Sequence, residues 1–302
     1  MKVSACIITY NHEDYIKECL DGALSQIVDF EYEIVIGEDK STDATLKICE
    51  EYEAKYPDRI SLVKRDKNLG MMANWSATLQ QCSGKYIAIC EGDDYWSDPL
   101  KLQKQVDFLE ANPEFILVFS NTDIILDTGA NMFKEHRDLY LLTESREFTS
   151  VEILDNWTIP TASVLFKNIP NWEVFANLLN SGKFIFADIV LFLYLAEQGK
   201  VYGMENYFVA YRKHTGGITQ VKDPVQHNIS HYRHLKSLIK YFGPHLKTRK
   251  ITNILSDSLL YTGLHYLKTG KVIDGVRMLA KSQRYDRSVL LQYIKNKFSR
   301  KI

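Results

Sequence analysis

The sequence predicts a mixed α/β fold, in which a mainly parallel, twisted β-sheet carries helices on both faces and a helical extension follows. Two observations support this prediction. Short apolar runs alternate with amphipathic segments through the first 120 residues, as in the strand-helix units that build parallel sheets. From about residue 225 the pattern is helical throughout. The chain has 302 residues, 45% of them hydrophobic, enough for one large domain or two modest ones.

The predicted elements follow one another in a regular order. Strands are expected at 3–10, 32–39, 60–64, 86–90 and 115–120, with helices between them. Residues 41–43 and Asp98-Pro99 are typical of helix N-termini. The second half is less regular. A hairpin is expected around Thr128-Gly129 and a strand at 161–167. A buried helix is expected at 189–196, directly after Asp188, and a strand at 207–217 that runs into a Gly-rich loop.

Charge is distributed unevenly along the chain. Residues 240–302 contain fourteen Lys or Arg against three Asp, a net +11, which leaves −12 for the first 239 residues to reach the overall −1. An acidic body with a basic tail indicates a metal-using site and a separate contact with an anionic surface, although a solvated helical face would explain the tail equally well. No nucleic-acid partner is expected.

The bulk features favour a cytoplasmic protein. No signal peptide is visible, and no apolar stretch approaches the roughly 20 residues that span a bilayer. The five cysteines lie mostly in apolar segments and form no C-x-x-C pair, which indicates reduced thiols; only Cys82, at a helix end, is expected to be more exposed.

Three polar clusters follow strands of the predicted sheet: Tyr10-Asn11, Glu38-Asp39 and the acidic run from Glu91 to Asp94. Ligands of such sheets bind beyond the carboxyl ends of the strands. Carboxylates suit Mg²⁺ or Mn²⁺, so the acidic run predicts a metal site; a solvated turn that caps the next helix is the alternative. The phosphate-binding motifs G-x-x-x-x-G-K-[ST] and G-x-G-x-x-G are absent, which argues against P-loop enzymes and dinucleotide enzymes.

Four segments occur in order: VSACIITYNHEDYIKECLDGALSQ, YEIVIGEDKSTDAT, KNLGMMANW and GKYIAICEGDDYWSDPLKLQKQV. Together they resemble the inverting family 2 glycosyltransferases, which have the GT-A fold, and the similarity extends through FADIVLFLYLAEQGK and YRKHTGG. The resemblance implies a GT-A domain over 1–220, with a nucleotide-sugar half at 1–120 and an acceptor half at 121–220. A helical extension would occupy 221–302.

The resemblance also implies roles for individual residues. Asp39 would accept a hydrogen bond from the nucleotide base, and Glu38 would contact the ribose. The other expected nucleotide-binding residues are Thr9, Tyr10, Asn11, Asn68, Gly70, Asn74 and Arg212.

The D-x-D position of the family is occupied by Glu91-Gly92-Asp93. Asp93 would bind Mn²⁺ or Mg²⁺ directly, with Glu91 and His214 as further ligands. Asp94 would hold the donor sugar or the loop. Glu91 and Glu38 replace the more usual aspartates, Lys40 stands where Gly or Asn is common, and Ala187 precedes the predicted base where an acid is frequent.

Asp188 matches the general base of the family, which removes a proton from the acceptor hydroxyl; the alternative is a simple N-cap for the helix that follows. Ser163 is expected to border the acceptor pocket. His227, His231 and His234 share one helical face, but they lack the Glu of H-E-x-x-H, so surface histidines are favoured over a metal site.

The resemblance thus implies a metal-dependent, inverting hexosyl- or N-acetylhexosaminyltransferase in bacterial surface-polysaccharide synthesis. A UDP-sugar is the expected donor, and a saccharide, free or lipid-linked, is the expected acceptor. The absence of Q-x-x-R-W favours transfer of one sugar per encounter. The amphipathic segment 286–302 would either lie on the inner face of the cell membrane or pack on the catalytic domain. The alternatives are a catalytically silent nucleotide-sugar-binding protein on the same fold and a nucleotidyltransferase, although the acidic segment TYNHEDY disfavours the latter.

Overall fold

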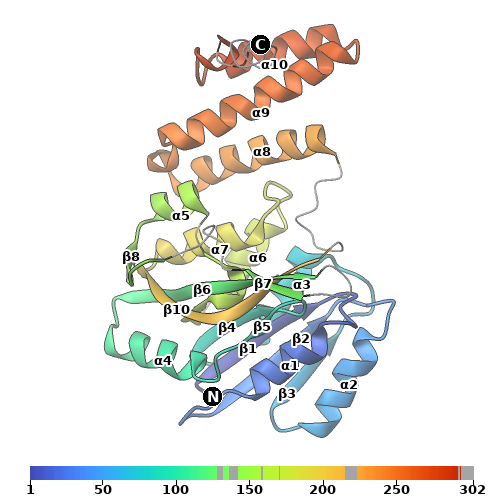
Figure 1. Cartoon of the computed structure of the whole chain (residues 1–302), viewed down its shortest axis with the longest axis vertical. Helices are drawn as coiled ribbons and strands as arrows, with labels where there is room; N and C mark the ends of the chain where they lie inside the picture. The colour runs from blue at the N-terminus through green and yellow to red at the C-terminus, as the bar shows by residue number, and fades with distance from the viewer. Residues whose placement is uncertain are drawn as a thin grey trace. The chain divides into compact units, whose positions relative to one another are not determined.

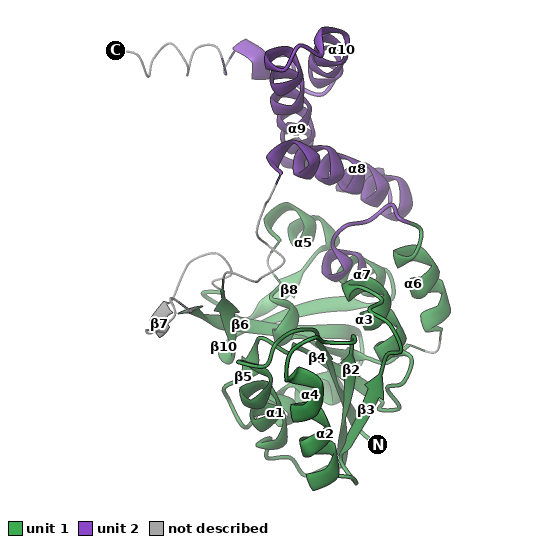
Figure 2. Cartoon of the chain, turned by 90° about the vertical axis from the view of Figure 1, so that its right-hand side faces the viewer, with its two compact units in different colours: residues 1–181, 191–217 green, residues 182–190, 218–302 purple. Residues whose placement is uncertain are grey.

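The computed structural model in Figure 1 describes residues 1–127, 132–135, 142–157, 159–169, 171–214, 223–291 and 293. The chain divides into two compact units (Figure 2). Unit 1 comprises Met1–Ser181 and Leu191–Gly217, and unit 2 comprises Gly182–Val190 and Ile218–Ile302. The predicted boundary at residue 220 lies outside the described residues, so the domain division stays a prediction.

Unit 1 is built on one mixed β-sheet, which confirms the predicted fold class. Within the described residues it contains ten strands: β1 (Val3–Thr9), β2 (Tyr32–Glu38), β3 (Ile60–Lys64), β4 (Tyr86–Glu91), β5 (Tyr95–Trp96), β6 (Phe115–Asp127), β7 (Met132–Glu135), β8 (Arg146–Phe148), β9 (Leu165–Lys167) and β10 (Lys200–Lys213). The order is β3-β2-β1-β4-β9-β6-β10-β5, with β7 paired to β6 and β8 to β10. Strands β3, β2, β1 and β4 run parallel, as do β6 and β10.

The central parallel strands are buried on both faces, and all seven residues of β1 are buried. A strand covered on both sides has no polar face, which is why the sequence there is a continuous apolar run. In the register of the sheet, Thr9 lies beside Glu38, and Ile8 lies beside Glu91. The carboxyl ends of β1, β2 and β4 therefore finish at nearly the same level.

Helices cover both faces of this sheet. Helices α1 (Ile16–Leu24), α2 (Thr45–Lys55) and α4 (Lys101–Ala111) share one continuous apolar core with it. Helix α3 (Met71–Leu79) lies on the opposite face, and the thiol of Cys82, just after its end, donates a hydrogen bond to the Thr78 carbonyl at 3.5 Å. The remaining short helices of unit 1 are α5 (Ser150–Asn156), η2 (Thr161–Ser163) and α6 (Trp172–Leu179), and α7 (Ala187–Ala196) crosses the boundary between the units.

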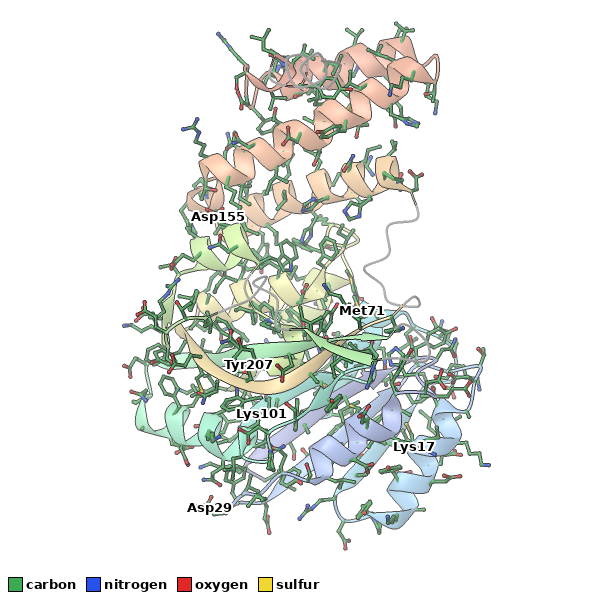
Figure 3. All side chains as sticks on the ribbon, in the orientation of Figure 1. Lys17, Asp29, Met71, Lys101, Asp155 and Tyr207 are labelled. Atoms are coloured by element: carbon green, nitrogen blue, oxygen red, sulfur yellow. The ribbon has the colours of Figure 1, made fainter. Side chains whose placement is uncertain are left out.

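Lys101, labelled in Figure 3, is a fully buried cation at the start of α4. Its Nζ donates a hydrogen bond to Oε1 of Gln105 at 2.8 Å and lies 4.5 Å from the centre of the Trp96 ring. Burial lowers the pKa of Lys101 to about 7. The Gln105 oxygen and the π-face of Trp96 compensate part of the cost of removing the amine from water.

Several details differ from the predicted elements. Helix α4 begins at Lys101 rather than after Asp98, whose carboxylate instead accepts a hydrogen bond from the Leu100 N–H. The predicted hairpin is present as β6 and β7, but its turn at Thr128-Gly129 lies outside the described residues. Cys82 is buried rather than exposed, because it packs against β1.

Unit 2 is helical, as predicted for the extension. It contains α8 (Pro224–Phe242), η3 (Pro244–Leu246), α9 (Arg249–Lys268) and α10 (Val272–Ser282). Side-chain oxygens of Asp223 and Thr248 accept hydrogen bonds from the first turns of α8 and α9, so both helices are capped as their sequences suggest. Within the described residues, no helix is both long enough and apolar enough to cross a membrane.

Candidate active site

The acidic run sits at the end of β4, where two imidazoles converge on one carboxylate. Oδ2 of Asp93 lies 3.1 Å from Nε2 of His214 and 3.8 Å from Nε2 of His12. Burial alone would raise the pKa of Asp93, but the hydrogen bond to His214 and the interaction with His12 outweigh it and hold this pKa below its usual range. The carboxylate at the predicted metal position is therefore ionised at neutral pH.

The neighbouring carboxyl, Asp94, has the opposite tendency. It is buried, and burial, followed by the nearby charges of Asp93 and Glu91, raises its pKa well above the usual range. One of its oxygens accepts a hydrogen bond from the backbone N–H of Arg212 at 2.8 Å. Asp94 therefore joins the β4 turn to β10, and its expected role in holding the donor sugar or the loop stays a prediction.

Arg212 fixes the same turn from β10. Its guanidinium is almost fully buried, donates to the backbone oxygen of Asp93 at 2.7 Å and forms an ion pair with Glu18 of α1. The guanidinium carbon also lies 4.7 Å from the centre of the Tyr15 ring. Arg212 is thus a support for the acidic turn in this structure, and its expected contact with the nucleotide stays a prediction.

Gly92 permits the close approach of the turn to β1. A Cβ at this position would lie 2.6 Å from Oγ1 of Thr9 and 2.9 Å from Nδ1 of His12. Separations of that length require the neighbours to move. A residue without a side chain is therefore required at position 92, because only then can the turn place Asp93 close to Thr9 and His12.

The end of β2 contributes a carboxylate that fixes a second loop. The two oxygens of Asp39 accept hydrogen bonds from the backbone N–H groups of Leu69 and Gly70 at 2.7 and 2.9 Å. The Asn68 amide donates to the Asp39 carbonyl at 3.0 Å. Three residues expected at the nucleotide, Asp39, Asn68 and Gly70, are therefore together, and each Asp39 oxygen retains a lone pair for a further donor.

Glu38 is buried, and its carboxylate accepts hydrogen bonds from the backbone N–H groups of Lys40 and Ser41. Lys40 has a φ of 62° and Asn11 a φ of 55°, a conformation that few residues other than glycine adopt without cost. The Asn11 side chain accepts from the Thr42 N–H at 2.8 Å. These bonds hold two adjacent turns beyond β1 and β2, while the Tyr10 side chain between them is exposed.

Asn74 serves a structural purpose in this arrangement. Its side chain is buried, donates to the Gly37 carbonyl at 2.8 Å and accepts from Nε of Arg65 at 2.9 Å. Because these bonds use both ends of the amide, Asn74 positions α3 behind the rim, and its predicted contact with the nucleotide is not carried further.

Ser163 is fully buried in η2 and does not face an open surface. Its hydroxyl donates to the Pro160 carbonyl at 2.7 Å and accepts from the Ser120 N–H at 3.3 Å. These contacts fix the path of the chain between α5 and β9. The acceptor role expected for Ser163 is therefore not carried into the proposal.

The side chains around Asp93 offer only part of a metal site. Within the described ranges, no three or more His, Cys, Asp or Glu side chains are arranged to enclose a metal ion. Mg²⁺ and Mn²⁺, however, are commonly held by one or two carboxylates together with the phosphates of a substrate. An ionised Asp93 with the His214 imidazole 3.1 Å away fits such a partial site. Glu91, on the same turn, is half-buried.

Asp188 lies inside the first turn of α7 rather than before it, so the predicted alternative of an N-cap is wrong. The helix was expected at 189–196 and begins two residues earlier, at the buried Ala187. A carboxylate in the first turn interacts favourably with the helix dipole. Asp188 is half-buried.

The histidines of α8 lie beside the segment that precedes Asp188, within unit 2. The Phe186 ring is 5.3–6.5 Å from the ring centres of His227, His231 and His234. His234 is fully buried rather than on the surface, because it packs against Phe184 and Phe186 and its Nδ1 accepts from the Ile185 N–H at 3.4 Å. Burial, followed by the charge of His231, lowers its pKa to about 3.

Two participants in the site were not predicted from the sequence. His12 contacts Asp93, and Glu18 pairs with Arg212, 194 residues away along the chain. His12 directly follows the first strand in TYNHEDY, so its place near the rim could have been noticed. Nothing in the local sequence indicates the partner of Glu18.

The fold of this chain is that of the GT-A glycosyltransferases. TarS from *S. aureus*, residues 1–349 in complex with UDP-GlcNAc, has a TM-score of 0.58 at 16% identity, over 94% of this chain and 92% of that chain. The mannosyltransferase PcManGT from *Pyrobaculum calidifontis*, solved with GDP-Man and Mn²⁺, has a TM-score of 0.56 at 17% identity, over 98% and 88%. At these identities the likeness establishes the fold alone.

The sequence itself gives the family. Residues 4–168 match the profile of glycosyl transferase family 2. The uncharacterized protein Rv1520 of *Mycobacterium tuberculosis* is 36% identical over 217 residues, which cover 72% of this chain and 60% of that protein. The poly(ribitol-phosphate) beta-glucosyltransferase of *Bacillus spizizenii* is 38% identical over 96 residues, 32% of this chain and 15% of that protein. This chain belongs to glycosyl transferase family 2. Its match covers 60% of the length of Rv1520 and 15% of the length of the beta-glucosyltransferase.

Proposed function

We propose that this chain is a metal-dependent, inverting glycosyltransferase that transfers one sugar from a nucleotide sugar to a saccharide. The proposed donor is a UDP-hexose or UDP-N-acetylhexosamine, and the acceptor is free or carried on a lipid, as in bacterial surface-polysaccharide assembly. The observation that carries the proposal is the convergence of Thr9, Asp39 and the Asp93-His214 pair on one edge of the sheet. Ligands bind at this edge in parallel sheets.

The two ends of this rim suit the two ends of a nucleotide sugar. Asp39 and the loop it holds offer hydrogen-bond acceptors and backbone groups for a base and ribose. The β4 turn offers an ionised carboxylate and imidazoles for a diphosphate and its cation. TarS was solved with UDP-GlcNAc and PcManGT with GDP-Man, which supports a nucleotide-sugar donor here.

Asp93 and His214 would hold the cation, with Glu91 as a further ligand. A bound divalent cation would stabilise the negative charge on the departing diphosphate. Of the two candidate ions, Mn²⁺ is favoured, because imidazole is a softer ligand than Mg²⁺ prefers. PcManGT was solved with Mn²⁺.

Asp188 is the proposed general base. It would accept the proton of the acceptor hydroxyl while that oxygen forms a bond to the anomeric carbon. The bond from the anomeric carbon to the diphosphate breaks on the opposite face, so the configuration inverts. Positioned proton transfer of this kind typically contributes about 10²–10⁴-fold to the rate.

Calorimetric titration with UDP, GDP, dTDP and CDP, each with Mn²⁺ and with EDTA, tests the nucleotide site. We expect UDP to bind tightly with Mn²⁺ and weakly with EDTA. In Asp93→Asn the metal-dependent part of the binding should disappear. Asp107→Asn, which changes an exposed carboxylate on α4, is the matched control and should bind UDP normally.

A second measurement separates catalysis from binding. Release of UDP from a panel of UDP-sugars, with and without saccharide acceptors, reports turnover. Binding of UDP without turnover of any donor would favour the catalytically silent nucleotide-sugar-binding protein. If UDP binding were unchanged both by EDTA and by Asp93→Asn, the proposed metal site would be wrong, and the acidic run would be a structural turn.

A further inference from the structure

Helix α10 of unit 2 carries an apolar stripe that faces solvent. Val272, Ile273 and Val276 are 57%, 77% and 56% exposed. These are among the most exposed large apolar side chains in the described part of the chain. Three such residues within five positions form a continuous patch rather than scattered surface contacts, and patches of this kind usually mark an interaction site.

The stripe is separate from the face that packs on α9. Gly275 is buried, and a Cβ added there would lie 2.8 Å from the Leu267 side chain and 3.0 Å from the Gly263 carbonyl. Gly275 therefore points at α9. At roughly 100° per residue, Val272, Val276 and Ile273 lie about 60–160° around the helix from Gly275, so packing within unit 2 leaves them uncovered.

Cations border the stripe. Arg277 and Lys281 lie on α10, and Arg284 lies in the turn two residues after its end; all three side chains are exposed. The one acid of α10, Asp274, lies 3.6 Å from Arg277. The wider segment 240–302 has fourteen basic and three acidic residues, whereas the first 239 residues carry −12. The stripe therefore lies in the basic part of the sequence, with Arg277 and Lys281 on the same helix.

We propose that α10 is a docking surface for an anionic lipid bilayer, with Val272, Ile273 and Val276 entering the headgroup boundary and Arg277, Lys281 and Arg284 contacting the lipid phosphates. Helices that lie on membranes combine an apolar stripe with flanking Lys and Arg in this way. Charge complementarity selects this partner, because an apolar stripe bordered by cations matches an anionic surface. The inference does not depend on the proposed transfer reaction.

Co-sedimentation of the full chain with vesicles tests the proposal. We expect binding to vesicles of phosphatidylglycerol and phosphatidylcholine, little binding to phosphatidylcholine alone, and release at high salt. The double variant Lys281→Gln/Arg284→Gln should weaken binding by about fivefold for each cation removed. Ile273→Ser/Val276→Ser should abolish most of the remaining binding.

Matched controls come from unit 1. Lys47→Gln/Lys55→Gln removes two exposed cations of α2, and Val174→Ser removes an exposed apolar residue of α6; neither should change vesicle binding. Unchanged far-ultraviolet circular dichroism and an unchanged thermal unfolding curve would show that the α10 variants fold. Equal binding of wild type and α10 variants, or none by the wild type, would overturn the proposal. Failure to bind vesicles together with a dimer that Ile273→Ser/Val276→Ser dissociates would assign the stripe to a second copy of the chain instead.

Discussion

Units 1 and 2 each enclose an ionisable side chain, Asp93 in unit 1 and His234 in unit 2, and the two differ in whether the charge is kept. At the rim of unit 1, Asp93 is kept ionised by imidazoles, and Asp39 and Glu38 each accept two backbone N–H bonds. In unit 2, His234 is kept neutral by burial among aromatic rings. An ionised carboxylate such as Asp93 can bind a charged ligand, whereas a neutral imidazole such as His234 can pack among aromatic rings.

The largest expected effect separates binding from turnover. Asp188→Asn removes the proposed base, which unit 2 carries, without altering any residue of the unit 1 rim. We expect kcat to fall by about 10²–10⁴-fold, with the affinity for UDP and Mn²⁺ unchanged. Steady-state assays and calorimetry on the same preparation check this. A comparable loss of UDP affinity would mean that Asp188 acts in the nucleotide site and not as a base.

The next effect concerns the tight fit of the β4 turn. Gly92→Ala places a methyl group 2.6 Å from Thr9 Oγ1, and overpacking of this kind costs about 1–3 kcal/mol of the free energy of unfolding. We also expect weaker UDP binding, since Asp93 must move. Gly270→Ala, which changes an uncrowded glycine with a φ of 80° after α9, is the comparison: it should reduce stability but leave UDP affinity intact. Unaltered UDP binding in Gly92→Ala would refute the steric argument.

The buried imidazole predicts a pH dependence of stability. His234 has a pKa of about 3 in the folded chain and about 6.5 when unfolded. Between these values the unfolded state binds more protons, so the free energy of unfolding falls as the pH falls below about 6.5. The loss should reach about 2 kcal/mol at pH 5. Burial lowers the pKa of His231 as well, which acts in the same direction.

Urea unfolding at pH 7 and pH 5 measures this loss. His234→Gln should be less stable than wild type at pH 7 but should lose less stability on acidification. His245→Gln, at an exposed position of η3, should behave as wild type. If His234→Gln showed the full wild-type loss between pH 7 and pH 5, the acid sensitivity would come from other groups.

The smallest effects test whether the units unfold separately. Thr149 forms a capping box at the start of α5 in unit 1, and Asp223 caps α8 in unit 2. Alanine at either position should cost about 1 kcal/mol. In calorimetry, Thr149→Ala should lower the transition of unit 1 and Asp223→Ala that of unit 2. One shared transition that both variants lower equally would show that the units unfold together.

The sequence predicted the centre of the fold closely. Strands β1 to β4 were expected within one residue of their observed ends. For β1, β2 and β4 the reason is that buried parallel strands are short apolar runs with polar ends. Strands β5 and β8 have only two and three residues and carry no periodic pattern. They form by pairing with β10, so tertiary contacts rather than local sequence determine them.

The site was predicted where it depends on the ends of strands. Glu38, Asp39 and Asp93 follow from that rule, whereas Thr9 was expected from the family resemblance. The ends of β1, β2 and β4, which carry them, lie at nearly the same level. Their partners do not follow from it. His214, 121 residues from Asp93 along the chain, was expected only through the family resemblance. Glu18, 194 residues from Arg212, was not expected at all. Likewise, the spacing of the α8 histidines gave their common face but could not show that this face turns toward Phe184 and Phe186.

The bonds from Leu69 and Gly70 to Asp39 have a consequence for observing the site. Both amide protons end on the carboxylate that is also proposed to meet the nucleotide base. When a ligand occupies that carboxylate, opening of the 68–70 segment must break contacts with two partners at once. Hydrogen–deuterium exchange at these two amides should therefore slow in proportion to occupancy. The exchange rates of these two amides would therefore report whether a given nucleotide binds at Asp39.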